Sequence, residues 1–203
     1  MTVARVLLLP GWQNSGPEHW QSRWEQIYGY ERVQQHDWMR PLRGDWIARL
    51  QDVVLGHTAH LAPDAPADIV LVGHSLGCLL VAAWAAHTQL AHHIRGALLV
   101  APGDPQREEL AGNLASWARI PQDALPFPSL LLGSQDDPYC SFTRAQAFAS
   151  AWGSRFIDYG LCGHINSDSG LGDWPQGQSL LTQLTERDSD ARGVATTRQQ
   201  QEG

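Results

Sequence analysis

The sequence contains no lysine: all 14 of its basic residues are arginine. Schiff-base and pyridoxal-phosphate chemistry depend on a lysine amine, so both are excluded. A Walker A phosphate-binding loop and a serine–lysine catalytic dyad also need a lysine, and they are excluded for the same reason. A nucleophilic serine in this chain would therefore depend on a histidine for its activation.

Cysteine is scarce, and long apolar runs are absent. The three cysteines include no C-x-x-C pair and favour neither a disulfide framework nor a structural zinc site. His57 and His60 form an H-x-x-H pair, but solvated surface histidines are the better interpretation of so weak a signal. No apolar stretch reaches transmembrane length, and the strand-like N-terminus leaves no room for a signal peptide. We therefore expect a cytoplasmic protein.

The overall composition is that of a folded globular protein. Of the 203 residues, 43% are hydrophobic and 17% are charged, so the chain can bury a sizeable core. The net charge of -7 argues against nucleic acid or an anionic membrane surface as a partner. We expect one domain at residues 3–184 and a disordered C-terminal tail at residues 185–203, because the tail lacks apolar periodicity. The oligomeric state stays open.

The most informative segment is a glycine motif between an apolar strand and an alanine-rich helix. Residues 69–72 are all apolar, residues 73–77 read G-H-S-L-G, and residues 78–86 have a helical pattern. This arrangement is typical of the nucleophile elbow G-x-S-x-G, with Ser75 at the apex of a sharp turn. Glycines are expected where strand and helix backbones approach too closely for a Cβ. The amide of Leu76 can then face a developing oxyanion. An ordinary strand-to-helix turn built from small residues is the alternative.

Strand-like and helix-like segments alternate along the chain, which predicts an α/β fold with a single doubly wound, mainly parallel sheet flanked by helices. Strands are predicted at residues 4–9, 69–72, 97–100, 129–132 and 155–159, with a weaker candidate at 32–35. Helices are predicted at residues 18–28, 45–57, 78–86, 110–117, 143–152 and 177–184. The first two have apolar stripes, formed by Trp20, Trp24 and Ile27 in one and by Trp46, Leu50, Val53 and Val54 in the other.

A nucleophilic Ser75 needs a histidine base and a carboxylate. Where such an elbow is catalytic, these follow in the order Ser, Asp, His, in loops after later strands. His164 is the only histidine after residue 93 and follows the last predicted strand in a glycine-flanked loop, so we expect it to be the base. His74 adjoins the serine, but the elbow backbone holds it, and we do not expect its side chain to reach the hydroxyl.

Three aspartates are candidates for the carboxylate. Asp136 and Asp137 are adjacent after one predicted strand, and a loop can aim only one of them at the histidine. Asp104 follows the preceding strand and is a third option. We favour Asp137, because the following Pro138 restricts its backbone. Turn capping is the expected role of the other two.

Four motifs in order resemble those of a known family. They read P-G-W-Q-N-S-G-P-E-H-W at residues 10–20, G-H-S-L-G at 73–77, S-Q-D-D-P-Y-C at 134–140 and G-H-I-N-S-D-S-G-L-G-D-W-P-Q-G at 163–177. The chain resembles the small serine hydrolases of the retinoblastoma-binding-protein-nine type, which include bacterial YdeN-like proteins, within the α/β-hydrolase superfamily. The resemblance implies a compact α/β-hydrolase fold with no metal or organic cofactor. It also implies Ser75, Asp137 and His164 as nucleophile, acid and base.

The resemblance also gives a role to the loop after the first strand. In the superfamily this loop supplies a second oxyanion amide, which here would come from Trp12 after Gly11. The chain has Pro-Gly at residues 10–11 where His-Gly is usual, as the family it resembles also has. Trp12, His19 and Trp20 are candidates to line the acyl or leaving-group pocket. For Trp20, a place in the helix core is an equal alternative.

These features predict a serine hydrolase that cleaves small ester or amide substrates through an acyl-enzyme on Ser75. The only partner expected is a small-molecule substrate. The predicted elements use nearly all of the chain, so no lid domain and a preference for short acyl groups are expected. Carboxylesterase, thioesterase, peptidase and amidase are not separated, because all use the same groups. A catalytically weak scaffold that binds protein is the remaining alternative, although an ordered Ser, Asp and His argue against it.

Overall fold

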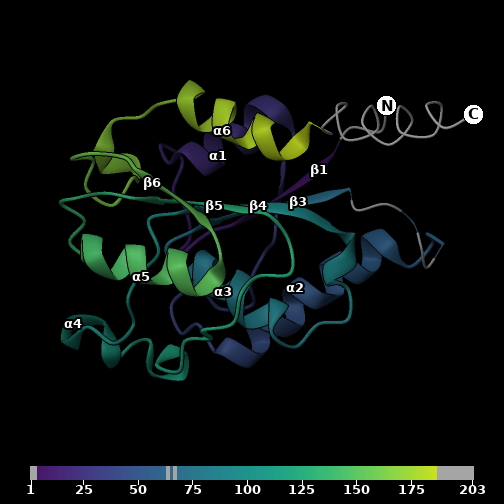
Figure 1. The fold of residues 1–203 in the computed structure, drawn as a ribbon, viewed down its shortest axis with the longest axis horizontal. Helices are drawn as coiled ribbons and strands as arrows, with labels where there is room; N and C mark the ends of the chain where they lie inside the picture. Colours follow the sequence, from purple (N-terminus) through teal and green to yellow (C-terminus); the bar gives the residue numbers. More distant parts are fainter. Residues whose placement is uncertain (1–3, 63–64, 66–67, 187–203) are drawn as a thin grey trace, which may run out of the picture.

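The centre of the molecule is a six-stranded parallel sheet in the order β2-β1-β3-β4-β5-β6 (Figure 1). The computed structural model describes residues 4–62, 65 and 68–186. The strands are β1 (Arg5–Leu9), β2 (Glu31–Arg32), β3 (Ile69–His74), β4 (Ile94–Val100), β5 (Ser129–Gly133) and β6 (Arg155–Asp158). The predicted α/β fold with a doubly wound parallel sheet is confirmed.

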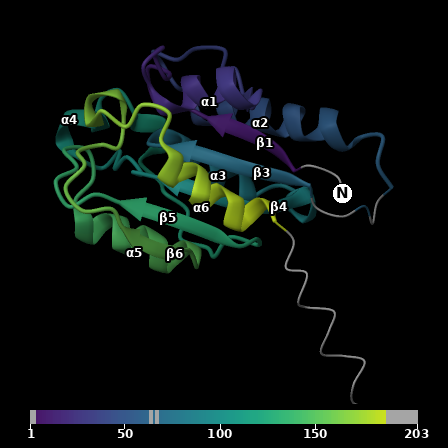
Figure 2. The same ribbon diagram turned by 90° about the horizontal axis from the view of Figure 1, so that it is seen from above.

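Helices cover both faces of the sheet. Figures 1 and 2 show α1 and α6 on one face and α2, α3 and α5 on the other. The helices are α1 (Trp20–Tyr28), α2 (Arg43–Thr58), α3 (Leu76–Ala85), α4 (Glu108–Ala111), α5 (Phe142–Trp152) and α6 (Pro175–Thr185). None of the helices in the described part of the chain is long and apolar enough to span a membrane.

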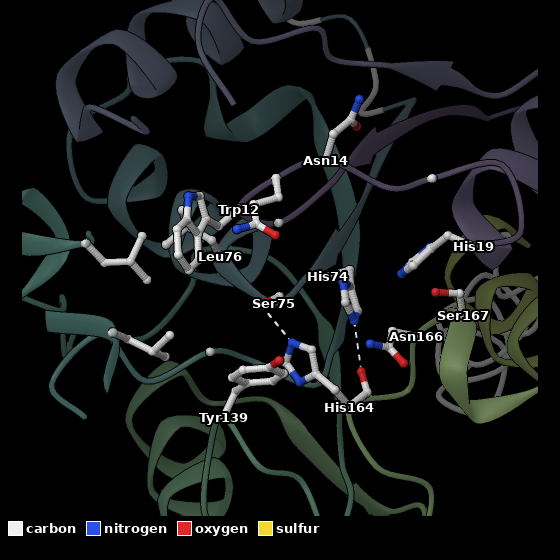
Figure 3. Close-up of a pocket in the computed structure, with 16 residues that line it drawn as sticks. Trp12, Asn14, His19, His74, Ser75, Leu76, Tyr139, His164, Asn166 and Ser167 are labelled. Atoms are coloured by element: carbon white, nitrogen blue, oxygen red, sulfur yellow. Dashed lines mark hydrogen bonds between the residues drawn. The ribbon is translucent and has the colours of Figure 1, made fainter. Parts of the chain in front are cut away.

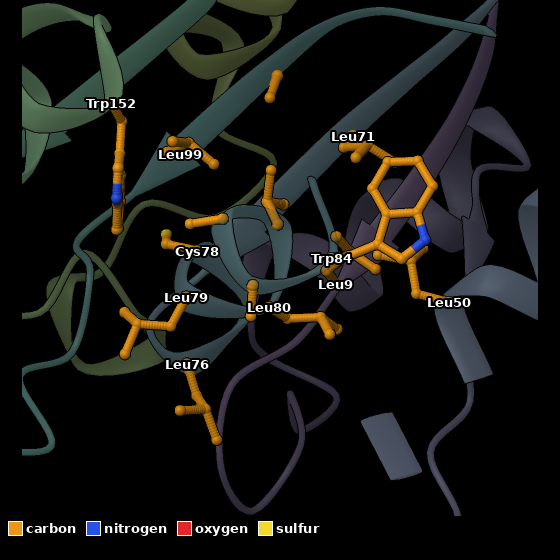
Figure 4. Close-up of a cluster of buried hydrophobic side chains, with 14 of the residues drawn as sticks. Leu9, Leu50, Leu71, Leu76, Cys78, Leu79, Leu80, Trp84, Leu99 and Trp152 are labelled. Carbon is orange, nitrogen blue, oxygen red and sulfur yellow. The ribbon is translucent and has the colours of Figure 1, made fainter. Parts of the chain in front are cut away.

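Alternating residues of the strands pack into two separate core layers, one on each face of the sheet. In β1, Leu7 and Leu9 face the α2–α3–α5 layer, whereas Val6 and Leu8 face the α1–α6 layer. A strand in the middle of a parallel sheet is apolar on both sides for this reason. Figure 4 shows the larger layer, in which leucines of three neighbouring strands point toward the fully apolar helix α3. This layer anchors the helix that follows Ser75.

The predicted apolar stripes were correct except at one position. Trp46, Leu50, Val53 and Val54 are all buried in α2, as predicted. In α1, Trp20 and Trp24 are buried, but Ile27 is 51% exposed, so its predicted burial is wrong. Trp24 is the last buried residue of α1, and its ring stacks on that of Trp174 with the centroids 5.5 Å apart.

One predicted helix is wrong. Residues 110–117 do not form a continuous helix: α4 ends at Ala111, and a separate 3₁₀ turn covers Ala115–Trp117. Gly112 and Asn113 lie at the break, and both residue types are weak helix formers. The weak strand predicted at 32–35 is shorter and begins earlier, at Glu31. The predicted C-terminal tail lies largely outside the described residues, since α6 extends to Thr185 and residues 187–203 are not described.

Candidate active site

Ser75 lies in the sharp turn between β3 and α3. Its backbone has φ +55° and ψ -118°, a conformation that residues with a side chain rarely adopt. Its N–H donates to the Val100 carbonyl of β4 at 3.0 Å, and its carbonyl accepts from the Cys78 N–H at 3.0 Å. Strain of this kind persists only where the surrounding structure imposes it, and here the neighbouring strand and helix do so.

The elbow glycines are required by close backbone contacts. A Cβ on Gly77 would lie 2.0 Å from the carbonyl oxygen of Leu9 in β1, and one on Gly73 would lie 2.9 Å from the backbone of Gly77. The expectation that strand and helix approach too closely for a Cβ at these positions is therefore confirmed. Gly11 of the first loop is equally restricted, because its Cβ would lie 2.7 Å from the Cβ of Ser75.

A hydrogen-bonded chain connects Ser75, His164 and Asp137. His164 Nε2 lies 2.9 Å from Ser75 Oγ, as the dashed line in Figure 3 marks. His164 Nδ1 lies 2.8 Å and 3.0 Å from the two carboxylate oxygens of Asp137. A carboxylate only accepts, so Nδ1 carries the proton and Nε2 is free to accept the proton of the Ser75 hydroxyl. The structure thus brings together three side chains from three different loops.

The other two candidate aspartates have different partners. Asp136 Oδ1 accepts from the Ser134 hydroxyl and from the Cys162 and Gly163 N–H groups, each at 2.8 Å. These three hydrogen bonds lower the pKa of Asp136, the Ser134 bond most of all. Asp104 pairs with Arg144 at 3.2 Å and accepts from the Gln106 N–H. Neither carboxylate is hydrogen-bonded to His164.

Residues 159–174, between β6 and α6, form the histidine loop. Ring nitrogens from β3 and α1 bind its main chain: His74 contacts the carbonyl of His164 at 2.9 Å, and Trp20 Nε1 donates to that of Ile165 at 2.8 Å. Trp24 Nε1 donates to the Asp173 carbonyl at 2.8 Å. As expected, His74 does not bond the serine. Its ring contacts the backbone carbonyl of His164 instead.

A cavity of about 320 Å³ opens above Ser75. Trp12 and His19 line it, but Trp20 does not: its ring is buried against Trp24 and Trp174, and its N–H is used by the histidine loop. The candidate role of Trp20 as a pocket residue is therefore replaced by its alternative, a place in the helix core. Its spacing to Trp24 was the signal for that alternative.

Sequence reasoning missed several residues of this cavity. Tyr139 packs its ring 4.6 Å from that of His164, centroid to centroid, and Asn166 and Ser167 continue the cavity wall beyond the histidine (Figure 3). Gly103 faces the nucleophile, since its Cβ would lie 3.2 Å from Ser75 Oγ. Each lies within three residues of a position that the sequence had flagged, so proximity to the motifs was the available signal.

The two residues expected to supply oxyanion amides, Leu76 and Trp12, line the same cavity as Ser75. Leu76 is the first residue of α3, so no carbonyl of that helix accepts its N–H. Trp12 follows Gly11 in the wall of the same cavity, and its indole N–H is bound to the Met39 carbonyl at 3.0 Å, which orients the ring. Both residues expected to supply oxyanion amides therefore line the space next to Ser75 Oγ.

Three imidazoles lie in a row behind the serine. The ring centroids are 4.6 Å apart for His19 and His74 and 4.8 Å apart for His74 and His164. Burial, with a further contribution from His164, lowers the pKa of His19 to about 3. Burial likewise lowers the pKa of His74 well below its ordinary value. Both rings are neutral near pH 7, so neither adds positive charge beside the catalytic candidate His164.

No group of three or more His, Cys, Asp or Glu side chains suited to a metal ion is present in the described part of the chain. His57, half of the H-x-x-H pair, is 2.8 Å from Glu31 through its Nε2. Its partner is thus a carboxylate on β2.

Comparisons with known proteins agree on one family. A family model described as serine hydrolase matches residues 6–183. A YdeN-like hydrolase from Pectobacterium atrosepticum is 33% identical, with a TM-score of 0.72 over 89% of this chain and 90% of that chain. The ydeN gene product from B. subtilis is 20% identical, with a TM-score of 0.68 over 89% and 98% of the two chains. No curated protein matches the chain by sequence.

More distant solved structures share the fold alone. An esterase, RhEst1 from Rhodococcus, is 14% identical, with a TM-score of 0.60 over 91% of both chains.

Proposed function

Since the chain belongs to the serine hydrolase family whose model it matches, we propose that it cleaves small esters or amides through an acyl-enzyme on Ser75. The family makes it a hydrolase, and the YdeN-like relative supports the same class. The observation that carries the finer proposal is the chain of hydrogen bonds from Ser75 Oγ through His164 to Asp137, open to a cavity.

In the first step Ser75 Oγ attacks the carbonyl carbon of the substrate while His164 Nε2 accepts the hydroxyl proton. The carboxylate of Asp137, 2.8 Å from Nδ1, stabilises the imidazolium that forms. The carbonyl π electrons move to oxygen, where the amides of Leu76 and Trp12 are suited to stabilise the negative charge.

In the second step the C–O or C–N bond to the leaving group breaks, and His164 donates its proton to that group. The acyl group remains esterified to Ser75. Water then attacks the acyl carbon with His164 as base, and the same imidazolium returns a proton to Ser75 Oγ. The acid product leaves, and the enzyme is restored.

The cavity favours short substrates. At about 320 Å³ it is near the lower end of small-molecule sites, and apolar side chains such as Leu110 and Leu114 form only part of its wall. We expect kcat/KM on p-nitrophenyl esters to level off at short acyl chains. A steady increase beyond about eight carbons, at roughly 0.8 kcal/mol of transition-state binding per CH₂, would contradict this expectation.

The test of the mechanism is labelling by a fluorophosphonate, which reacts with activated serines. We expect label on Ser75, and Ser75→Ala should abolish both labelling and ester hydrolysis, a loss on the order of 10⁴-fold or more. Ser179→Ala, in an exposed position of α6, is the control and should keep both. Hydrolysis that persists in Ser75→Ala would refute the proposal. A panel of esters, thioesters and aminoacyl amides would then decide which acyl bond the enzyme prefers.

A further inference from the structure

His19 uses only one of its two ring nitrogens within the protein. It is the N-cap of α1, and its Nδ1 accepts from the Gln21 N–H at 3.1 Å. An Nδ1 that accepts has no proton, so the proton of this neutral ring is on Nε2. The sequence is unusual here, because Ser, Thr, Asp and Asn are the preferred N-caps. A histidine supplies the same cap and adds a donor on the far side of the ring.

That donor is buried and has no partner. Only 5% of the surface of His19 is exposed, and its Nε2 is buried and makes no hydrogen bond within the described residues. Its ring lines the cavity above Ser75 (Figure 3). A buried donor left without an acceptor destabilises the folded state, so such groups are rare unless a ligand or water satisfies them. The low pKa of His19 keeps the ring a neutral donor.

The cavity has two unlike halves. On one side of Ser75 lie Trp12 and Leu76, as Figure 3 shows, and the buried side chains Leu110 and Leu114 add apolar surface to the cavity lining. On the opposite side His19, Asn166 and Ser167 present polar groups, as Figure 3 shows. The Asn166 Oδ1 accepts from the Asp168 N–H, which leaves its NH₂ as the group available to the cavity.

We propose that the Nε2–H of His19 binds an oxygen of the leaving group, which makes the enzyme selective for short esters whose alcohol part carries an uncharged hydrogen-bond acceptor. This inference rests on the proposed function of Ser75. It assigns the apolar half of the cavity to the acyl group and the polar half to the leaving group.

The position of the histidine loop indicates which half of the cavity binds the leaving group. His164 must hand its proton to that group, so the leaving group lies beside His164. Asn166 and Ser167 continue the same loop and form the polar wall together with His19. The lining residues in the described part of the chain include no Arg, Asp or Glu, so the site has no full charge for a carboxylate or an ammonium group. An ether, carbonyl or hydroxyl oxygen fits the available donors.

The test uses substrates that differ by one atom. In the alcohol pair, 2-methoxyethyl propionate is compared with butyl propionate, so that an ether oxygen replaces a CH₂ in the leaving group. In the acyl pair, methyl methoxyacetate is compared with methyl butanoate, with the same exchange in the acyl group. The ratio of kcat/KM within each pair is measured for the wild type and for His19→Asn, so that intrinsic reactivity cancels.

His19→Asn is the informative variant because asparagine caps a helix as well as any residue but is too short to present a donor in the cavity. We expect the preference for the ether oxygen in the alcohol pair to fall roughly 10-fold, the effect of about one hydrogen bond, with no change in the acyl pair. His36→Asn, at an exposed histidine that does not line the cavity, should leave both ratios unchanged. An unchanged alcohol ratio in His19→Asn overturns the inference, and so does a fall confined to the acyl pair.

A second readout does not depend on turnover. The ¹⁵N shifts of the His19 ring should report a neutral Nε2–H tautomer at pH 5–7, and the Nε2–H resonance should shift on adding 2-methoxyethanol but not butanol. A charged ring, an Nδ1–H tautomer or an equal response to both alcohols would overturn the inference even in an active enzyme. Failure of fluorophosphonate to label Ser75 in the wild type would instead refute the proposed function, and the ring spectra would still decide the assignment of His19 as a donor.

Discussion

The elbow and the histidine loop hold their side chains by different physics. The elbow is fixed by backbone sterics: Ser75 has a positive φ, and Gly77 packs directly on the β1 main chain. The histidine loop is fixed by polar side chains, with Asp136 accepting from two of its N–H groups and Trp20 donating to one of its carbonyls. Its backbone turns repeatedly, with a positive φ at four glycines (residues 160, 163, 170 and 172) and also at Ile165 and Trp174.

This difference explains why the geometry of the elbow could be predicted from a short motif, whereas His164 was singled out without any sign of the hydrogen bonds that hold its loop. Steric constraints allow few residue types, so they produce a short motif that can be recognised without a structure. A polar scaffold can be built from many residues that are distant in the sequence, such as Asp136 and Trp20. Substitutions in the elbow should therefore lower the stability of the fold. Substitutions in the histidine loop should instead displace His164 and lower activity.

The largest expected effect is a difference in activity between variants of the two adjacent aspartates, Asp136 and Asp137. Asp137→Asn should lower kcat about 10⁴-fold, because asparagine at the acid position favours the wrong tautomer of His164. Asp136→Asn makes the same chemical change but keeps an oxygen that can accept from Cys162 and Gly163, so we expect a loss below about 10-fold. The measurement is kcat on a short p-nitrophenyl ester, with urea unfolding to show that both variants fold.

A reversed order of severity would show that Asp136 is the acid and that the loop anchor is Asp137. Asp136→Ala sharpens the comparison, because alanine removes the acceptor altogether. A loss between those of the two asparagine variants is expected, and it should come from displaced His164 rather than from the wrong tautomer.

The second prediction concerns the elbow. Gly77→Ala should lower the free energy of unfolding by about 3 kcal/mol, because its Cβ would lie 2.0 Å from the Leu9 carbonyl oxygen and the main chain would have to move. Gly56→Ala is the matched control: it lies in α2 with no atom within 4 Å of the new Cβ, and it should raise stability by about 1 kcal/mol. Urea unfolding measures both, and a Gly77→Ala as stable as the wild type would show that the elbow is not sterically fixed.

Much of the molecule was predictable from sequence, for a physical reason. Buried parallel strands are continuously apolar, so the sheet and most helices could be recognised, and Ser75, Asp137 and His164 were singled out by their places after strands. The chemical roles of these residues remain proposals. The break at Gly112 was missed because the helix at residues 110–117 was predicted from its apolar pattern, and the low helix propensity of Gly112 was given too little weight.

The tryptophans of α1 show which contacts could not be predicted from sequence patterns. The spacing of Trp20 and Trp24 correctly indicated a buried helix face, but it gave no sign that their indole N–H groups bind the carbonyls of Ile165 and Asp173. These hydrogen bonds join residues 145 and 149 positions apart, so they leave no periodic pattern in the sequence. The same holds for His19: its Nδ1 caps α1 and its Nε2 is buried without a partner, and nothing in the local sequence indicates either role.

The smallest expected effect is a pH dependence where the two regions meet. The ring of His19 packs on that of His74 in the elbow, and both have a pKa below the unfolded value of about 6.5, in His19 at about 3. Between pH 6.5 and 3 the unfolded chain therefore binds more protons than the folded one, so stability falls as the pH is lowered. One such histidine contributes a slope of at most about 1.4 kcal/mol per pH unit. His19→Asn should reduce the slope measured by urea unfolding between pH 4.5 and 5.5 by up to that amount, whereas above pH 7 the two proteins should keep a constant difference. Equal slopes below pH 5.5 would mean that His19 binds a proton equally well in the folded and the unfolded protein. The buried ring would then be charged at that pH and could not act as a neutral donor.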